Sequence, residues 1–173
     1  KKFSPVEVTR DYLQRIQDSR ELNAFITVTF EHAIKQASIA EHKYLAGEQT
    51  GILEGIPITY KDNIYTNGIR TTSGSKIEED FIPNIDAGIV TKLHREGAIC
   101  LGKVNMHEYA FGITSNNPFY GPVKNPWNTD YTPGGSRGGS AGAVSASLSV
   151  ASIGTCQTGA MCSPARPTVA VGY

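Results

Sequence analysis

Two polar segments of the sequence hold side chains that could do chemistry. The longer one is residues 131–147, YTPGGSRGGSAGAVSAS, with five glycines and four serines and almost no bulky aliphatic side chain. Such a segment cannot form a core of its own, and its glycines let the backbone approach another group closely. Ser136 stands between two glycine pairs, and ordered sequence is expected on both sides. The pattern therefore indicates a site rather than a linker.

The shorter segment is Lys-Asp-Asn at residues 61–63, which follows the apolar residues 56–60. A lysine can act as a base when burial lowers its pKa, and it can then work with a serine. Lys61 is the best candidate for this role, although a solvated charge at a strand end explains it equally well. The four histidines fall on predicted helices, where surface or packing roles are expected: His32, His42, His94 and His107.

Phosphate binding is the alternative use of the glycine segment, because the backbone N–H groups of a helix N-terminus favour an anion or a developing oxyanion. The spacing does not match GxxxxGK[ST], since no lysine follows Gly139. It does not match GxGxxG either, since the first two glycines are adjacent and follow a loop. A hydrolase would need a nucleophile, a base and an oxyanion site.

Composition narrows the classes of function. The chain has 173 residues and a net charge of zero, and its basic residues are scattered, so neither nucleic acid nor an anionic membrane is an expected partner. No apolar run has the length of a membrane span, and no signal-peptide pattern is present. Cys100, Cys156 and Cys162 match neither a disulfide framework nor a common zinc motif. We therefore expect a cytoplasmic location and no metal.

The elements that must position these segments form two regions. Ser4, Pro5 and Glu7 predict a capped helix start, and residues 30–46 predict a second helix that ends at Gly47. We expect residues 1–50 to form a helical cover without chemistry of its own. We expect residues 51–173 to be the N-terminal part of a single α/β core, incomplete in a chain that begins without methionine and stops after an apolar patch.

Strands and helices are predicted to alternate within that core, at residues 56–60 (strand), 86–96 (helix), 98–101 (strand), 102–110 (a turn into a short helix), 141–147 (helix) and 149–153 (strand). The helix over residues 86–96 should turn Ile89, Val90 and Leu93 inward. The succession predicts an α/β fold with a mixed or parallel sheet.

Five segments in order resemble the amidase signature family: GIPITYKDNI, TTSGS, GAICLGKVNMHEYAFG, TSNNPFYGPVKNPW and TPGGSRGGSAGAV. The resemblance covers residues 22–173, and the combination is more specific than any single motif. Residues 114–127 resemble general bacterial amidases more than the A-type component of glutamyl-tRNA amidotransferase. The resemblance implies a mixed sheet flanked by helices, a small-molecule amide substrate and no cofactor, and it leaves room for a homodimer.

The resemblance also implies a Ser–cis-Ser–Lys triad. Lys61 falls on the family's lysine, and Ser136 falls on the bridging serine, which follows a cis peptide bond from Gly135. A neutral Lys61 would draw a proton through Ser136 from the nucleophile, which would attack a carboxamide carbon and release ammonia or an amine. Water would then cleave the acyl-enzyme. Thr155 falls beside this site as a supporting residue.

The end of the chain departs from the family pattern. Residues 154–173, GTCQTGAMCSPARPTVAVGY, align without gaps with a pattern close to G-T-D-T-G-G-S-I-R-x-P-A. The nucleophilic serine falls on Ala160, and alanine carries no nucleophile. The oxyanion backbone falls on the three preceding residues, Gln157, Thr158 and Gly159. Using Ser163 as nucleophile instead would need a three-residue shift that breaks the flanking match. Cys162 is a second possible substitute, two positions away, where a turning backbone is expected to point it elsewhere.

Three further substitutions lie near the implied site. Arg137 stands where the second serine of the glycine motif is expected, and Cys156 and Cys162 stand where the family has Asp and Arg. Three hypotheses remain. The chain is an amidase whose nucleophile belongs at position 160, a catalytically dead amidase-like binding or scaffold protein, or a glutamyl-tRNA amidotransferase component of the A type.

Overall fold

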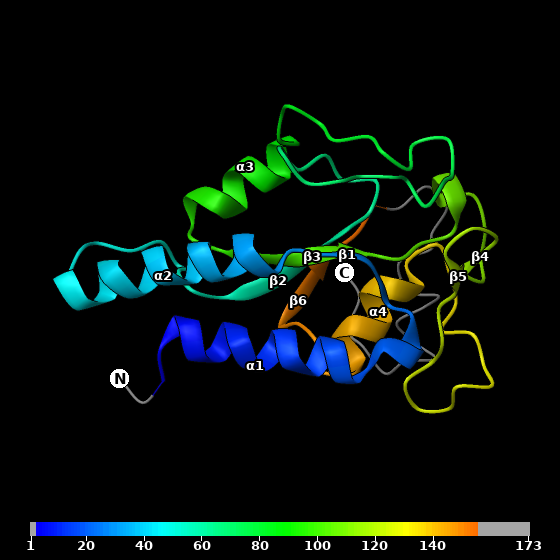
Figure 1. The fold of residues 1–173 in the computed structure, drawn as a ribbon, viewed down its shortest axis with the longest axis horizontal. Helices are drawn as coiled ribbons and strands as arrows, with labels where there is room; N and C mark the ends of the chain where they lie inside the picture. The colour runs from blue at the N-terminus through cyan, green and yellow to red at the C-terminus, as the bar shows by residue number, and fades with distance from the viewer. Residues whose placement is uncertain (1–2, 156–173) are drawn as a thin grey trace.

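A four-stranded mixed sheet forms the centre of the protein (Figure 1), whose computed structural model describes residues 3–155. The strand order is β1-β3-β2-β6, with bounds β1 (Phe25–Val28), β2 (Pro57–Lys61), β3 (Ile99–Val104) and β6 (Ala151–Ile153). Strand β2 runs parallel to both of its neighbours, whereas β1 is antiparallel to β3. This arrangement confirms the predicted α/β class with a mixed sheet flanked by helices.

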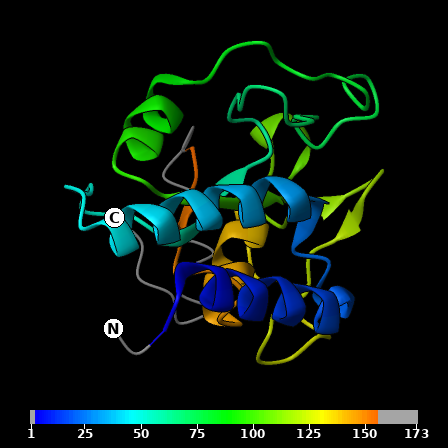
Figure 2. The same cartoon turned by 60° about the vertical axis from the view of Figure 1, so that its left-hand side comes forward.

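The helices cover both faces of this sheet (Figures 1 and 2). Their bounds are α1 (Pro5–Asp18), α2 (Phe30–Ala46), α3 (Gly88–Arg95) and α4 (Gly138–Ser145). Helices α1, α2 and α4 share one hydrophobic cluster with the sheet, and α3 packs into a second cluster. The remaining described elements are short: the 3-10 helices η1 (Arg20–Leu22) and η2 (Glu108–Ala110), and the hairpin β4 (Asn116–Asn117) with β5 (Gly121–Pro122).

The first two helices follow from local sequence signals. The Ser4 side chain accepts from the Glu7 backbone, and the Glu7 side chain accepts from the Ser4 backbone, which is the predicted capping box. Helix α2 ends at Gly47, whose φ of 69° is a left-handed conformation that glycine adopts without strain. Both predicted helices are therefore confirmed.

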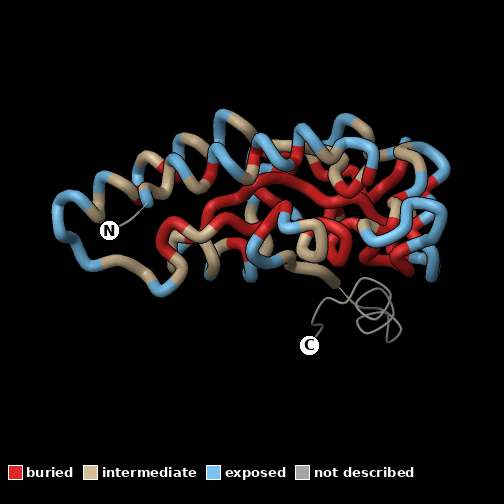
Figure 3. Tube along the Cα trace, turned by 90° about the horizontal axis from the view of Figure 1, so that it is seen from below, coloured by how far each residue is buried: buried red, intermediate tan, exposed pale blue. Residues whose placement is uncertain are grey.

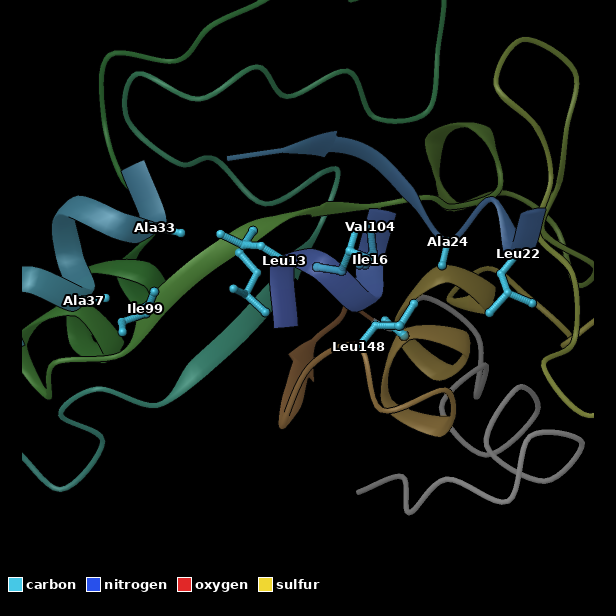
Figure 4. Close-up of a cluster of buried hydrophobic side chains, with 11 residues drawn as sticks. Leu13, Ile16, Leu22, Ala24, Ala33, Ala37, Ile99, Val104 and Leu148 are labelled. Atoms are coloured by element: carbon cyan, nitrogen blue, oxygen red, sulfur yellow. The ribbon is translucent and has the colours of Figure 1, made fainter. Parts of the chain in front are cut away.

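Two clusters of buried side chains hold the layers together. Figure 4 shows the first, in which Leu13 and Ile16 of α1 lie beside Val104 of β3. Alanines at 33 and 37 allow α2 to approach the sheet closely, because they carry little bulk. On the other face, Val90 of α3 packs with Tyr60 and other residues of β2 and β3. Figure 3 shows the consequence, with buried chain in the middle and exposed turns on the outer side of the helices.

Strand β1 is absent from the predicted elements, and β3 is longer than predicted. The predicted strand ends before Gly102, since glycine often interrupts a strand. Gly102 instead lies inside β3, because a Cβ there would collide with the Thr27 carbonyl of β1. Glycine thus permits the close approach of β1, and Lys103 and Val104 lie in a strand rather than in the predicted turn and helix.

Smaller corrections concern the remaining elements. Helix α3 is shorter than predicted, and Ile89 is wrong as an inward residue because it is 43% exposed. Residues 115–127, predicted to be a loop, contain the β4–β5 hairpin. Helix α4 begins three residues earlier than predicted, directly within the glycine segment. These shifts move element ends and leave the predicted order of the core unchanged.

Candidate functional site

Lys61 is the last residue of β2, and its side chain is completely buried. Its Nζ atom donates a hydrogen bond to Ser136 Oγ at 2.7 Å, across 75 residues of sequence. All five residues of β2 are buried, so the strand delivers the lysine into the interior rather than to solvent. The solvated strand-end charge considered for Lys61 is therefore wrong.

Ser136 lies just before α4 and is 2% exposed. The Gly135–Ser136 peptide bond is cis, as the resemblance implied. The backbone oxygen of Ser136 accepts from the His107 N–H at 3.3 Å. Ser115 Oγ accepts from the Gly138 N–H at 2.8 Å. The backbone on both sides of Ser136 is thus held by the segment that follows β3.

The glycines around Ser136 are required by close backbone contacts. A Cβ on Gly135 would lie 2.6 Å from the Thr114 nitrogen, and a Cβ on Gly138 would lie 2.7 Å from Ser115 Oγ. A Cβ on Gly139 would collide with the Asn105 carbonyl oxygen. The sequence predicts that the backbone of the glycine segment approaches another group closely. In the structure that group is the segment of residues 105–115.

Thr155 connects the two parts of the site. Its backbone oxygen accepts from Lys61 Nζ at 3.3 Å and from Arg137 Nε at 2.6 Å. Its Oγ1 accepts from Asn63 Nδ2 at 2.9 Å. Asn63 is not among the predicted site residues, although its place two positions after Lys61 could have indicated a polar side chain at the same strand end.

Arg137, which replaces the second serine of the family motif, is 8% exposed. Its side chain packs so closely on Gly154 that a Cβ there would lie 2.8 Å from Arg137 Cδ. Arg137 and Lys61 both donate to the backbone oxygen of Thr155, so the guanidinium lies close to the Lys61–Ser136 pair.

The remaining predicted site residues lie outside the described part of the chain. They are the oxyanion candidates Gln157, Thr158 and Gly159 and the nucleophile position Ala160. Their roles stay predictions. Within residues 3–155, no group of three or more His, Cys, Asp or Glu side chains could hold a metal ion. In the same part of the chain, no helix is long and apolar enough to cross a membrane.

A pocket of about 540 Å³ opens where β2 and β6 end, and it shares Asn63 and Thr155 with the site. The other lining residues are mostly apolar: Ile64, Tyr65, Ile85, Asp86, Ala87, Ile89, Ile153 and Gly154. Ligands of open α/β sheets bind outside the carboxyl ends of parallel strands. The pocket therefore lies where a substrate of this site could reach it.

Comparison with known proteins agrees with this geometry. The sequence model of the family described as Amidase matches residues 7–173. The chain is 47% identical to the A-type component of the glutamyl-tRNA(Gln) amidotransferase of Azotobacter vinelandii, over 99% of this chain and 36% of that protein. It is similar in fold to the peptide amidase of Stenotrophomonas maltophilia, with a TM-score of 0.89 and 35% identity over 94% of this chain and 35% of that one.

A third relative is the A-type amidotransferase component of Thermotoga maritima, with a TM-score of 0.79 and 34% identity over 93% of this chain and 33% of that one. The chain spans about a third of the length of these relatives. Identity is 47% and 34% to these two amidotransferase components and 35% to the peptide amidase, so it does not support the preference for general amidases drawn from residues 114–127. The family match, the fold and the Lys61–Ser136 pair agree, and the chain belongs to the amidase signature family.

Proposed function

We propose that the protein is an amidase-type hydrolase that cleaves a carboxylic amide into an acid and ammonia or an amine. The observation that carries this proposal is the 2.7 Å hydrogen bond between the buried Lys61 Nζ and Ser136 Oγ. When Lys61 is neutral, a serine hydroxyl at this distance can pass its proton to Nζ, so the two residues can work as a base and a relay.

The proposed roles follow the direction of proton transfer. Lys61 in its neutral form accepts a proton from Ser136, which takes one from the nucleophile at position 160. The nucleophile attacks the carbonyl carbon, and the backbone N–H groups of residues 157–159 stabilise the oxyanion. The proton returns to the leaving nitrogen, the C–N bond breaks, and water cleaves the acyl-enzyme.

Position 160 holds alanine, so the relay ends on a methyl group in the chain as written. We expect no turnover by this chain and amide hydrolysis by an Ala160→Ser variant, measured as ammonia release from a panel of simple aliphatic and aromatic amides. Adding Lys61→Met to that variant should lower kcat by about 10³-fold or more, because the relay loses its base. Adding Lys35→Met on the exposed side of α2 is the matched control and should leave kcat unchanged.

Two results would oppose the roles proposed for these residues. Turnover by the unmodified chain would assign the nucleophile to another residue, and an inactive Ala160→Ser variant that binds amides would favour the second candidate function. That candidate is a catalytically dead amidase-like protein that binds amides, and the alanine at position 160 is the observation that favours it.

A third candidate is a component of a glutamyl-tRNA amidotransferase, and the sequence relatives favour it. Such a component would act with protein partners, whereas a general amidase acts alone or as a homodimer. Glutaminase activity that depends on a partner chain would distinguish the two. The scattered charge and the cysteine usage support a cytoplasmic setting for either function.

A further inference from the structure

A second lysine, Lys103 of β3, is completely buried on the opposite side of the sheet from the candidate site. It pairs in register with Tyr60, whereas Lys61 pairs with Val104, and successive side chains of a strand point to opposite faces. The proposed reaction gives Lys103 no role. Burying the charge of a lysine costs free energy, so a fully buried lysine must gain compensating hydrogen bonds or an opposite charge.

Lys103 Nζ reaches both arms of the loop that follows β2. It donates to the Ile64 carbonyl oxygen and to Thr66 Oγ1 on the first arm, and to Thr71 Oγ1 at 2.8 Å on the second arm. The loop begins directly after Lys61 and carries Asn63, the partner of Thr155. The ammonium group therefore fastens a loop whose first residues belong to the candidate site.

Asp62 joins the same two arms from the other end. Its Oδ2 accepts from both the backbone N–H and the hydroxyl of Thr72, and its backbone oxygen accepts from the Ser73 N–H at 3.2 Å. Its second oxygen, Oδ1, is buried and accepts no hydrogen bond within residues 3–155. Its negative charge is balanced in part by Lys103, and desolvation by burial raises the pKa of Asp62.

The charges of Lys103 and Asp62 each favour the ionised form of the other. Desolvation lowers the pKa of Lys103 to about 8, and the Coulomb attraction of Asp62 opposes that change. Removing one partner of a buried charge pair leaves the other charge uncompensated, whereas removing both is often tolerated. The pair should therefore behave as a unit.

We infer that Lys103 is a positioning residue that, together with Asp62, fixes loop 62–74 and thereby holds Lys61 against Ser136. This inference rests on the proposed function only for its consequence in catalysis. The geometry that it predicts exists without substrate. Lys61 is the terminal residue of its strand, so the position of its backbone depends on where the next residues are fastened.

The test is NMR of the protein labelled with ¹³C-lysine, without substrate. The ε-methylene signal of Lys61 is assigned by its loss in Lys61→Met. Lys103→Met should move this signal toward the shift of a solvated lysine and should speed amide exchange at Thr72 and Gly74 by about tenfold or more. The double variant Lys103→Met/Asp62→Asn lacks the same three hydrogen bonds to the loop, so its Lys61 signal should stay displaced.

Lys43→Met is the matched control, because Lys43 forms a partly buried ion pair with Glu54 away from the site. It should leave the Lys61 signal unchanged. If Lys103→Met prevents folding, Thr71→Val removes one acceptor of Lys103 and should give a smaller shift in the same direction. An unchanged Lys61 signal in a folded Lys103→Met or Thr71→Val variant would overturn the inference, and so would recovery of the signal in the double variant, which would assign the displacement to the unpaired Asp62 charge. Inactivity of the Ala160→Ser variant toward amides would contradict the proposed function alone, since the NMR readout needs no turnover.

Discussion

The backbone N–H of Gly139 donates a 3.1 Å hydrogen bond to the backbone oxygen of Asn105, at a point where no side chain would fit. This contact joins the first turn of α4 to the end of β3. It lies three residues after Ser136, so the position of the serine depends on how closely α4 approaches the sheet.

The first prediction is that Gly139→Ala destabilises the protein. The added methyl group would overlap the Asn105 carbonyl, and overpacking of this kind costs about 1–3 kcal/mol. The free energy of unfolding in urea should fall by that amount, and Ser136 should be displaced.

Gly142→Ala is the matched control in the same helix. Its nearest neighbour, Val123 Cγ1, would be 3.8 Å from the new Cβ, which is ordinary contact. Alanine favours a helix over glycine by about 1 kcal/mol, so this variant should be as stable as the parent or more stable. Equal losses in the two variants would contradict the role given to the Gly139–Asn105 contact.

The fold is predictable from the sequence wherever a local signal decides the structure. The Ser4–Glu7 capping box and the end of α2 at Gly47 depend on contacts within a few residues, so local sequence patterns predict them. Strand β1 has only four half-buried residues, too few for a period of two to show. The prediction at Gly102 is wrong because the reason for this glycine, the approach of Thr27, comes from residues about 75 positions away.

The second prediction concerns Asn63 and Thr155. Asn63→Ala removes the 2.9 Å hydrogen bond to Thr155 Oγ1, which should cost about 1 kcal/mol of unfolding free energy. Amide exchange of the residues near Thr155 should accelerate, because the segment that follows β6 loses its hydrogen bond to loop 62–74. Asn67→Ala, at an exposed position of the same loop, should change neither quantity. Equal behaviour of the two variants would show that the Asn63 contact contributes nothing.

Some residues of the candidate site can be predicted from sequence motifs, and others can be identified only from the three-dimensional structure. Lys61 and Ser136 are predictable, because a lysine after an apolar strand and a serine among glycines each leave a local pattern. Asn63 and Lys103 are missed as partners, since their importance depends on which atoms the sheet brings together. The burial of Lys61 cannot be decided from the sequence. A side chain at the end of a strand is exposed or buried according to how the following loops cover it.

The third prediction concerns Cys100, which is completely buried in β3. Desolvation raises the pKa of this thiol to about 11 from its ordinary value of 9.0. The reactive thiolate is then about 100-fold less populated at pH 8 than in a free cysteine. Iodoacetamide labelling, followed by mass spectrometry of the peptide that holds Cys100, should be slow in the folded protein and fast in urea. Equally fast labelling in both would contradict the burial of this strand.

The last prediction is a pH dependence of stability that arises from Lys103. Its pKa is lowered to about 8 in the folded protein, mainly by desolvation, and is 10.5 in the unfolded chain. Between these values the unfolded chain binds more protons than the folded one, so the free energy of unfolding rises with pH. The rise between pH 8 and pH 10 should reach about 2 to 3 kcal/mol and should be smaller in Lys103→Met. Urea denaturation across this range measures the difference. Lys43→Met should retain the parent slope, and identical slopes in the parent and in Lys103→Met would refute the burial of a titrating lysine at this position.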